Sequence, residues 1–353
     1  MRNIIVTGGA GFIGANFVKY ILKEDKEAKI INVDKLTYAG NLENLSEVEQ
    51  NKNYIFEKAD ICDKVAIESI FSKYDIDTVI NFAAESHVDR SINDPTEFIN
   101  TNIKGTQILL DVAKKNWTIG EDKYKEKAKY IQISTDEVYG SLVGRDTFFT
   151  EKTPLNPHSP YSASKASADL LVKAYYDTYK FPACITRCSN NYGPYQFPEK
   201  FIPLIINNCI KHNKIPVYGE GDNIRDWLYV EDHCKAIYKV LQNGKLGEVY
   251  NIGGHNEKTN MEIVNIIIKY LNLNLDKTIT TDLIVHVKDR KGHDKRYGMN
   301  PEKISNELNW KPETRFDEGI IKTIQWYLDN EKWLNNVTNG KYQDYYKKMY
   351  EVK

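Results

Sequence analysis

The start of the chain limits the possible folds more than any other stretch. A short apolar run at residues 3–7 leads into the glycine-rich turn GGAGFIG at 8–14, and a helical pattern follows directly. A continuous apolar run of this kind is typical of a strand that is buried on both faces. A strand, a glycine turn and a helix in this order indicate a dinucleotide-binding unit. Gly8, Gly11 and Gly14 would let the backbone approach a pyrophosphate, which the N–H groups of the helix N-terminus would bind.

An acidic residue follows this turn at the distance that a dinucleotide site requires. A second strand, predicted over residues 30–33, ends in Asp34, which lies 20 residues after Gly14. A carboxylate at that position binds the ribose hydroxyls of the adenosine and would repel a 2′-phosphate. The sequence therefore predicts NAD, and not NADP, as the cofactor. The glycine spacing is G-x-x-G-x-x-G, which differs from the G-x-G-x-x-G fingerprint.

Helical segments alternate with predicted strands along the first part of the chain. Beyond the two strands above, strands are predicted over residues 54–57, 78–82, 130–134 and 183–187, and a strand-like run returns at 249–252. This alternation predicts an α/β fold with a doubly wound parallel sheet, as in Rossmann-like domains. Such sheets bind their ligands at the carboxyl ends of the strands. Ser86 and His87 follow one of these ends and would face the crevice.

Three further residues near the predicted cofactor site have more than one interpretation. Asp60 suits the adenine edge, but it could equally be a plain turn residue. A helix is predicted from Pro95 to about Lys115, and Thr101 and Asn102 within it could point at the cofactor, cap or pack. The apolar face of that helix is predicted to consist of Phe98, Ile99, Ile103, Leu109 and Leu110.

Two groups of reactive side chains follow the predicted strand at residues 130–134. Asp136 and Glu137 come just after it, and Tyr161 and Lys165 stand four residues apart in a predicted helix. This spacing places Tyr161 and Lys165 on one helical face, where the Lys charge would favour the phenolate. Such a Tyr can take a proton from a sugar hydroxyl while hydride leaves the same carbon. The two carboxylates supply a second acid/base pair, which simple alcohol oxidation does not need.

The use of both carboxylates sets a condition on the backbone. Side chains of adjacent residues in a strand point to opposite faces of the sheet. Asp136 and Glu137 can therefore reach one substrate only if the chain leaves strand geometry at Thr135, and we expect that it does.

The character of the sequence changes after Gly193, where prolines and aromatic residues indicate an irregular lobe above the crevice. Arg225 and Arg290 in this part suit a diphosphate, because guanidinium binds such oxygens bidentately. An exposed Arg is, however, often without a ligand. We expect a dinucleotide-binding domain and a smaller mixed α/β lobe. The domain comprises residues 1–188 with a returning segment at about 226–255, and the lobe comprises 189–225 and 256–353.

Composition excludes several other classes of protein. Lys and Arg total 48 against 49 Asp and Glu, so no basic excess indicates nucleic-acid binding. The five cysteines form no CxxC pair and lack a zinc-ligand pattern, so we expect reduced thiols and no metal. No apolar run approaches the length of a membrane span. The sequence enters its first strand without a leader pattern, so we expect a cytoplasmic location.

Three segments resemble one family of the extended short-chain dehydrogenase/reductases, the dTDP-glucose 4,6-dehydratases. These segments cover residues 83–91, 134–140 and 289–294, and the Thr-Asp-Glu part of the second is the most specific. The resemblance extends over nearly the whole chain. It departs from the family pattern at Lys291, where Pro is expected, and at residues 298–300. Both departures lie beside the expected nucleotide site and leave the catalytic residues untouched.

The resemblance implies roles for individual residues. The implied catalytic residues are Thr135, Asp136, Glu137, Tyr161 and Lys165. The implied NAD contacts are Gly8, Gly11, Phe12, Ile13, Gly14, Asp34, Lys35, Leu36, Thr37, Asp60, Ile61, Ala83, Ala84, Thr101, Tyr161, Lys165 and Asn191. The implied substrate contacts are Ser86, His87, Thr135, Asn190, Lys200, Phe201, Pro216, Tyr218, Arg225, Asn260, Asp289, Arg290 and His293. A homodimer is also implied, joined by a four-helix bundle of the helix after Pro95 and the helix carrying Tyr161.

The implied reaction converts dTDP-glucose to dTDP-4-keto-6-deoxyglucose and water, a step of deoxysugar biosynthesis such as that of rhamnose. Three alternatives stay open at this point. UDP-glucose could be the substrate, since one methyl group in an apolar pocket discriminates by only about 1–3 kcal/mol. An epimerase or decarboxylase would leave Asp136 and Glu137 without a role. A catalytically silent NAD-binding regulator predicts damage to the Tyr161 and Lys165 pair, which is intact.

Overall fold

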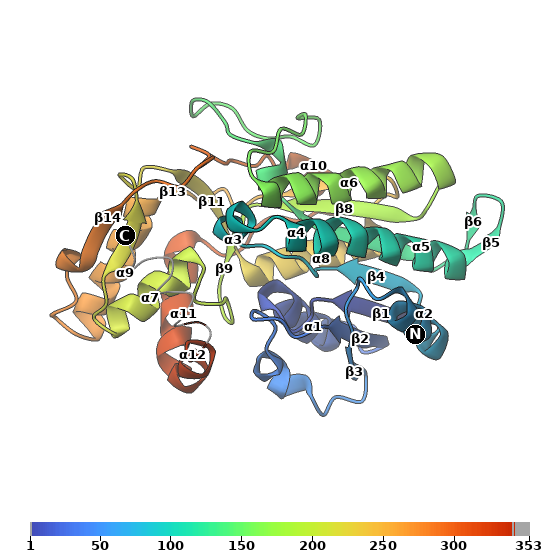
Figure 1. Cartoon of the computed structure of the whole chain (residues 1–353), viewed down its shortest axis with the longest axis horizontal. Coiled ribbons are helices and arrows are strands. Elements are labelled where there is room, and N and C mark those ends of the chain that lie inside the picture. Colours follow the sequence, from blue (N-terminus) through green and yellow to red (C-terminus); the bar gives the residue numbers. More distant parts are fainter. Residues whose placement is uncertain (1, 341, 343–353) are drawn as a thin grey trace.

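The computed structural model describes residues 2–340 and 342, and a seven-stranded parallel sheet lies at its centre (Figure 1). The strand order is β12-β8-β7-β4-β1-β2-β3, and every neighbouring pair is parallel. In that order the strands span Val249–Ile252, Ala183–Cys188, Lys129–Thr135, Thr78–Asn81, Arg2–Thr7, Ala28–Asp34 and Tyr54–Lys58. The sheet contains all the predicted strands, so the predicted doubly wound α/β class is confirmed.

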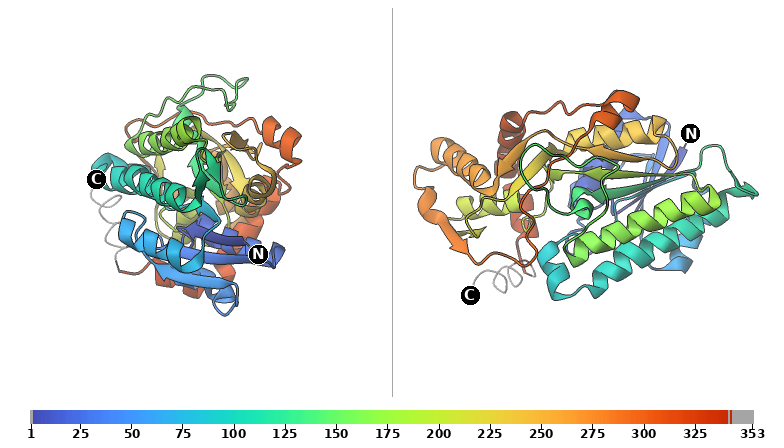
Figure 2. Two further views of the ribbon diagram at one scale, coloured as in Figure 1. Left: turned by 90° about the vertical axis from the view of Figure 1, so that its right-hand side faces the viewer. Right: turned by 90° about the horizontal axis from the view of Figure 1, so that it is seen from above.

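Helices cover both faces of this sheet (Figures 1 and 2). They are α1 (Phe12–Glu24), α2 (Lys64–Tyr74), α5 (Thr106–Trp117), α6 (Pro160–Tyr179), α8 (Val230–Asn243) and α10 (Glu302–Leu308). Alternate residues of a strand face opposite sides, so Ile4 and Val6 of β1 join the cluster under α1 and α8, whereas Ile5 joins the cluster under α2 and α5. Burial on both sides explains why these strands are continuously apolar in sequence.

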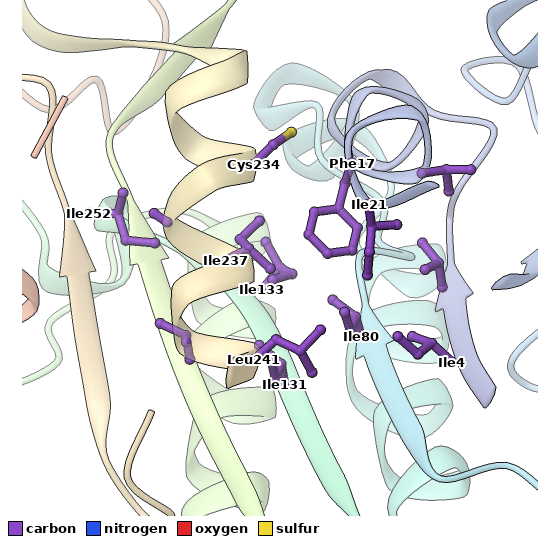
Figure 3. Close-up of a cluster of buried hydrophobic side chains, with 14 of the residues drawn as sticks. Ile4, Phe17, Ile21, Ile80, Ile131, Ile133, Cys234, Ile237, Leu241 and Ile252 are labelled. Carbon is purple, nitrogen blue, oxygen red and sulfur yellow. The ribbon is translucent and has the colours of Figure 1, made fainter. Parts of the chain in front are cut away.

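The packing of α1 and α8 against the sheet brings together two parts of the chain that are far apart in sequence. Figure 3 shows Phe17 and Ile21 of α1 and Ile237 and Leu241 of α8 above Ile131 of β7. All five side chains are almost completely buried. The segment that carries α8 and β12 therefore completes the sheet, although it follows a long excursion into the second lobe.

The long helix predicted after Pro95 is interrupted by a π-helical turn. It consists of α4 (Thr96–Phe98), the π-helix η2 (Ile99–Gly105) and then α5. A π turn adds one residue to the helical repeat and so shifts the register of the following side chains. Of the predicted apolar face, Ile99 is 53% exposed and so does not belong to the core of this chain.

The second lobe is a mixed α/β structure, as predicted. Its strands form a three-stranded sheet, β13-β11-β9 (Glu257–Thr259, Ile224–Tyr229, Asn190–Tyr192), and a parallel pair, β10 (Ile215–Tyr218) and β14 (Ile284–Val287). Its helices are α7 (Phe201–Ile210), α9 (Asn260–Asn274), η4 (Thr281–Leu283), α11 (Phe316–Asp329) and α12 (Glu331–Val337).

The remaining elements are η1 (Leu42–Val48), α3 (Val88–Asn93), β5 (Thr118–Gly120), β6 (Lys123–Tyr124) and η3 (Asp136–Tyr139). The residue limits of the two domains stay a proposal.

The end of the chain is predicted from sequence to be a helix that docks through aromatic side chains. In the structure Trp333 of α12 and Tyr342 are both buried. Tyr345, Tyr346 and Tyr350, which belong to the same prediction, lie outside the described residues. Among the helices of residues 2–340, none combines the length and the apolar character needed to cross a bilayer.

One buried lysine ties the sheet to helix α8. Lys129, the first residue of β7, is 8% exposed. Its Nζ donates to the carbonyl oxygens of Val240 at 2.7 Å, Leu241 at 3.1 Å and Gly244 at 2.8 Å. A helix C-terminus presents unsatisfied carbonyl groups and a partial negative charge. Lys129 satisfies both and thereby fixes α8 above the strand that carries the reactive residues.

We predict that Lys129→Met lowers the free energy of unfolding by about 1–3 kcal/mol, because buried carbonyl groups lose their donor. Urea denaturation followed by circular dichroism measures this. Lys123→Met, which removes an exposed lysine of the β5–β6 hairpin, is the control and should leave stability within about 0.5 kcal/mol of the parent protein. Equal stability of the two variants would contradict the capping role of Lys129.

Candidate active site

A cavity of about 310 Å³ opens at the carboxyl ends of the central strands. It is lined by all five predicted catalytic residues and by every predicted NAD contact except Leu36. Leu36 has a φ of +58° and packs against the apolar cluster under α1 and α8. Its backbone N–H donates to Asp34 Oδ1 at 2.8 Å. The backbone of Leu36 therefore holds Asp34 and its partly buried side chain packs against the cluster, while its contact with NAD stays a prediction.

The glycine turn has the shape that a dinucleotide site needs. Gly8 has a φ of +65°, and a Cβ there would lie 2.7 Å from the backbone nitrogen of Ala83. A Cβ on Gly14 would lie 2.3 Å from the carbonyl oxygen of Gly8. Gly11 is the N-cap of α1 and provides no side-chain cap. The N–H groups of the first turn of α1 are therefore left for an anionic ligand.

The acidic residues at the adenosine end are held by backbone groups. Asp34 Oδ2 accepts a hydrogen bond from the backbone N–H of Ala10 at 3.0 Å. Asp60 accepts one from the backbone N–H of Cys62 at 2.9 Å and forms an ion pair with Lys35 at 3.4 Å. Asp60 also lines the cavity. Asp60 therefore closes a turn and also faces the cavity, and its contact with the adenine edge stays a prediction.

Several polar atoms of the cavity wall are buried without a partner. They include Thr101 Oγ1, Asn190 Oδ1 and Gln196 Oε1. Buried polar groups are normally hydrogen-bonded, so these atoms fit a ligand rich in hydroxyl and amide groups, as NAD and a sugar are. Asn102 has a structural role, which is the alternative to a cofactor contact. It forms hydrogen bonds with the backbone of Glu85 and with the hydroxyl of Ser164.

The predicted departure from strand geometry at Thr135 is confirmed. Strand β7 ends at Thr135, and Asp136 begins the short 3₁₀ helix η3. Thr135 Oγ1 accepts a hydrogen bond from the N–H of Glu137 at 3.3 Å and donates to Asp136 Oδ1 at 3.1 Å. Both carboxylates line the cavity as a result.

The surroundings of the two carboxylates differ. Burial, strengthened by the charge of Glu137, raises the pKa of Asp136 well above its usual range. Burial also raises the pKa of Glu137, but the positive charges of Arg290, Arg225 and Lys200 oppose this. Both pKa values are therefore raised, and the positive charges favour ionisation of Glu137 over that of Asp136. Two carboxyl groups with separated pKa values are the basis of an acid and base assignment.

Tyr161 and Lys165 lie in the first turns of α6. Ser159 caps this helix through a capping box and Pro160 occupies its first position, as the sequence predicts. The ring of Phe98 packs edge-on at 6.3 Å from that of Tyr161.

The predicted effect of Lys165 on the Tyr161 phenolate stays a prediction, and other groups in the structure oppose it. Burial, followed by the charges of Glu137, Cys188 and Asp136, raises the pKa of Tyr161 well above its ordinary value. The Nζ of Lys165 donates to the carbonyl oxygen of Ile133 at 2.6 Å. Helical spacing correctly places the two side chains together, but it does not show the neighbouring carboxylates, which oppose the Lys charge.

The predicted substrate contacts fall into two groups. Ser86, Thr135, Asn190 and Lys200 line the cavity. The others do not line it, and most belong to the second lobe. They are His87, Phe201, Pro216, Tyr218, Arg225, Asn260, Asp289, Arg290 and His293.

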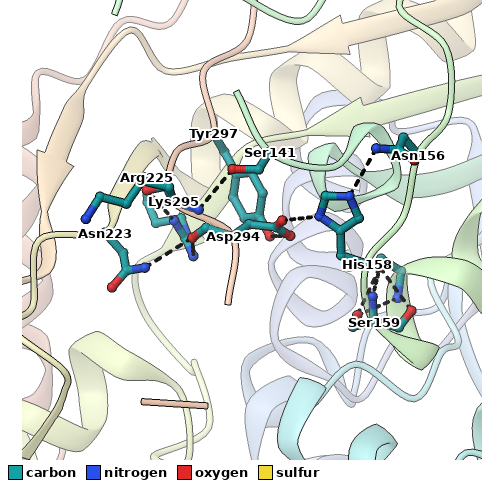
Figure 4. A network of polar contacts seen from close by, with 10 residues as sticks. Ser141, Asn156, His158, Ser159, Asn223, Arg225, Asp294, Lys295 and Tyr297 are labelled. Carbon is teal, nitrogen blue, oxygen red and sulfur yellow. Dashed lines mark hydrogen bonds and ion pairs between the residues drawn. The ribbon is translucent and has the colours of Figure 1, made fainter. Parts of the chain in front are cut away.

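Arg225 and Arg290 nevertheless lie near the reactive carboxylates, since both charges act on Glu137. Arg225 is 5% exposed, and its Nη2 donates to the carbonyl oxygen of Asp294 at 2.9 Å (Figure 4). Its guanidinium lies 4.2 Å from the ring centre of Tyr297. The Nε of Arg290 is buried without a hydrogen-bond partner. Neither arginine is therefore a freely solvated surface residue.

The segment at residues 196–199 also contributes to the cavity wall, and it was not predicted from the sequence. Gln196, Phe197 and Glu199 all line the cavity. Glu199 forms an ion pair with Arg90 at 3.2 Å and a hydrogen bond with Tyr38, and the Arg90 guanidinium lies 3.8 Å from the ring centre of Tyr38. The run of prolines and aromatic residues indicates an irregular lobe there, but not which side chains face the ligand. No cluster of three or more His, Cys, Asp or Glu side chains suited to a metal ion occurs among the described residues.

Comparison with known proteins agrees with this arrangement. Residues 5–323 match the GDP-mannose 4,6 dehydratase family. The chain is 52% identical to dTDP-glucose 4,6-dehydratase of Salmonella typhimurium over 99% of both proteins. The chain belongs to the dTDP-glucose 4,6-dehydratase family. The matched range contains every residue that lines the cavity.

Solved structures of this family show the same fold. The Bacillus anthracis enzyme in complex with NAD has 49% identity and a TM-score of 0.85, with 96% of this chain and 100% of that chain covered. The Streptomyces venezuelae enzyme with NAD and dTDP bound has 41% identity and a TM-score of 0.88, with 95% and 100% covered. The resemblance inferred from sequence and the Rossmann-like fold are therefore both confirmed.

We predict that Glu137→Gln lowers the pKa of Tyr161 in protein freed of bound ligands, because it removes the nearest opposing negative charge. Carbon-13 NMR of labelled tyrosine side chains, assigned with Tyr161→Phe, measures the titration. In the parent protein Tyr161 should titrate above the ordinary value of about 10. Glu302→Gln, at an exposed site, is the control. A Tyr161 that titrates below the ordinary value would contradict the opposing effect of the carboxylates.

Proposed function

We propose that this protein is a dTDP-glucose 4,6-dehydratase, a hydro-lyase that forms dTDP-4-keto-6-deoxyglucose and water. The observation that carries this proposal is the placement of Asp136 and Glu137 in one 3₁₀ turn that lines the same cavity as Tyr161. An epimerase or decarboxylase needs no such acid/base pair. A silent NAD-binding protein has no need for a Tyr161 and Lys165 pair beside it. The product class places the reaction in deoxysugar biosynthesis, such as that of rhamnose.

The cofactor would occupy the part of the cavity between the glycine turn and α6. The first turn of α1 would bind the pyrophosphate, and Asp34 would bind the adenosine ribose. Thr101 and Asn191 would contact the nicotinamide end together with Tyr161 and Lys165. When bound, NAD accepts a hydride from the sugar and later returns it, so it is regenerated in each turnover.

The side chains of this protein would move the protons. Tyr161 takes the proton of the C4 hydroxyl as that carbon is oxidised to a ketone. The ketone acidifies the C5 hydrogen, and Glu137 removes it as a proton. Asp136 donates its proton to the C6 hydroxyl, which leaves as water. C5 then regains a proton as C6 is reduced, so the net change is the loss of one water molecule.

Three positive groups in or near the cavity suit the nucleotide. Arg225, Arg290 and Lys200 would bind the diphosphate, because guanidinium and ammonium groups both bind phosphate oxygens. Their burial strengthens these contacts, since a buried charge interacts in a lower effective dielectric. Names of relatives with about 50% identity favour the thymine nucleotide over the uracil nucleotide.

We also propose a homodimer joined by α5 and α6, located in the cytoplasm. Ile99 lies on η2, which leads directly into α5, and Leu170 lies on α6, and the two are 53% and 59% exposed. Large apolar side chains on neighbouring helices suit the centre of a helix-bundle interface. The five cysteines are free, which suits a reducing compartment.

The proposed roles of the two carboxylates predict which reaction steps their variants can still carry out. Asp136→Asn and Glu137→Gln should each still reduce the bound cofactor when mixed with dTDP-glucose, because C4 oxidation needs neither group. Elimination should slow by about 10²–10⁴-fold, the usual contribution of a positioned acid or base. Single-turnover absorbance of reduced cofactor measures both steps, and the parent enzyme should show reduction followed by reoxidation.

Exchange of the C5 hydrogen separates the base from the acid. Asp136→Asn should still exchange this hydrogen with solvent deuterium at the ketone stage, whereas Glu137→Gln should not. Mass analysis of sugar recovered from heavy water measures the exchange. If Glu137→Gln exchanges as fast as the parent enzyme, Glu137 is not the base.

We predict a bell-shaped pH dependence of the elimination rate. Glu137 must be ionised, and burial raises its pKa, so the rate falls as the pH drops through a value above the ordinary Glu value of about 4.3. Asp136 must be protonated, and burial raises its pKa further, so the rate falls again as the pH rises through it. The two limits belong to a coupled pair. Asp136→Asn should remove the alkaline limb from the residual rate, and an unchanged alkaline limb would contradict the assignment.

A further inference from the structure

A buried ion pair that the mechanism does not use lies beside the turn of the two carboxylates. Arg187 of β8 donates through Nε to Asp169 Oδ2 of α6 at 2.8 Å. The two side chains are only 7% and 1% exposed. A buried pair is often no more stabilising than apolar residues of the same size. We therefore asked what else this pair contacts.

The pair holds both ends of the segment that carries the reactive residues. Ser134, which directly precedes Thr135, donates to Asp169 Oδ2 at 3.0 Å. Tyr139, the last residue of η3, accepts a hydrogen bond from Arg187 Nη1 at 2.9 Å. The Tyr139 hydroxyl in turn donates to Asn251 Oδ1 of β12 at 2.8 Å. Thr135, Asp136 and Glu137 therefore lie between two anchors of a single ion pair.

The same pair is also part of the helix that carries Tyr161. Asp169 follows Lys165 by four residues and so lies on the same face of α6. Burial lowers the pKa of Lys165, and the charge of Asp169 is the first of the two that oppose this. Asp169 thus contacts Ser134, which precedes the acid/base turn, and it also lies on the face of α6 that carries Lys165.

We propose that Asp169 and Arg187 are positioning residues that set the Asp136–Glu137 turn at the right distance and angle from Tyr161. This inference rests on the proposed function. Oxidation at C4 uses Tyr161, Lys165 and the cofactor, and neither of these two residues lies in η3. Elimination across C5 and C6 needs both carboxylates at the sugar that Tyr161 holds. A displacement of about 1 Å can lower the rate of such a step by about 10²-fold.

Tyr139→Phe tests this proposal with little change in volume. It removes the hydroxyl that joins Arg187 to the end of η3 and keeps the ring, which stacks on Phe149 at 5.0 Å. Tyr130→Phe is the matched control, because Tyr130 is also a buried tyrosine and its hydroxyl donates to Gln132 at 3.0 Å in the same strand, remote from the turn. A second test variant, Asp169→Leu with Arg187→Met, removes both charges together so that neither is left unpaired.

The readout is the single-turnover reaction with dTDP-glucose, in which cofactor reduction and reoxidation are timed separately. Tyr139→Phe and the double variant should reoxidise the cofactor about 10–10²-fold more slowly. In Tyr139→Phe, which leaves the charge of Asp169 on Lys165 in place, the rate of cofactor reduction should stay within about 2-fold of the parent. Exchange of the C5 hydrogen should slow by the same factor as reoxidation. Tyr130→Phe should change neither step, even if its melting temperature falls as far.

Other results would overturn the inference. If both steps slow equally, or if only the melting temperature falls, Asp169 and Arg187 serve stability alone. If neither step changes in either test variant, the turn does not depend on the pair. If the parent enzyme itself fails to reduce its cofactor with dTDP-glucose, the proposed function is wrong and this inference falls with it.

Discussion

The short hydrogen-bonded turn at Thr135 is the constraint on which the site depends. A strand that continued through Glu137 would send its carboxylates to opposite faces of the sheet. The Thr135 hydroxyl instead accepts a hydrogen bond from the N–H of Glu137, and the chain begins a 3₁₀ helix at Asp136. The sheet supplies the place for this turn, since β7 lies between β4 and β8 at the centre. Helix α6 then supplies Tyr161 beside it.

Burial gives this turn its chemistry, and the surrounding charges divide the roles. Burial raises the pKa of both carboxyl groups. Arg290, Arg225 and Lys200 oppose this at Glu137, whereas Arg225 alone of the three opposes it at Asp136. The groups proposed to bind the diphosphate are thus the groups that keep the proposed base ionised. A bound diphosphate would offset part of their charge. Substrate binding and the ionisation of Glu137 are therefore linked through the same positive side chains.

Local signals in the sequence explain why so much of the fold was predicted. The glycine turn, the apolar strands and the Ser159-Pro160 cap each depend on residues that are neighbours in sequence. Other features are not signalled by residues that are neighbours in sequence. They are the π turn at 99–105, the packing of the Leu36 side chain and the orientation of the Glu199 side chain toward the cavity. Periodicity cannot show an added residue in a helix, and spacing cannot show which charges surround a tyrosine. These are the points at which the sequence analysis was wrong or incomplete.

The two departures from the family pattern concern different parts of the molecule. Gly298 packs against a buried ion pair, because a Cβ there would lie 2.7 Å from Glu257 Oε1 and 3.0 Å from Arg296 Nη2. Arg296 in turn donates to the carbonyl oxygens of Gly144 and Thr147 at 3.1 and 2.8 Å. The departure at 298 therefore belongs to the packing of the loop that follows η3. Lys291 is exposed and adjoins Arg290, so any change in nucleotide preference would have to arise there.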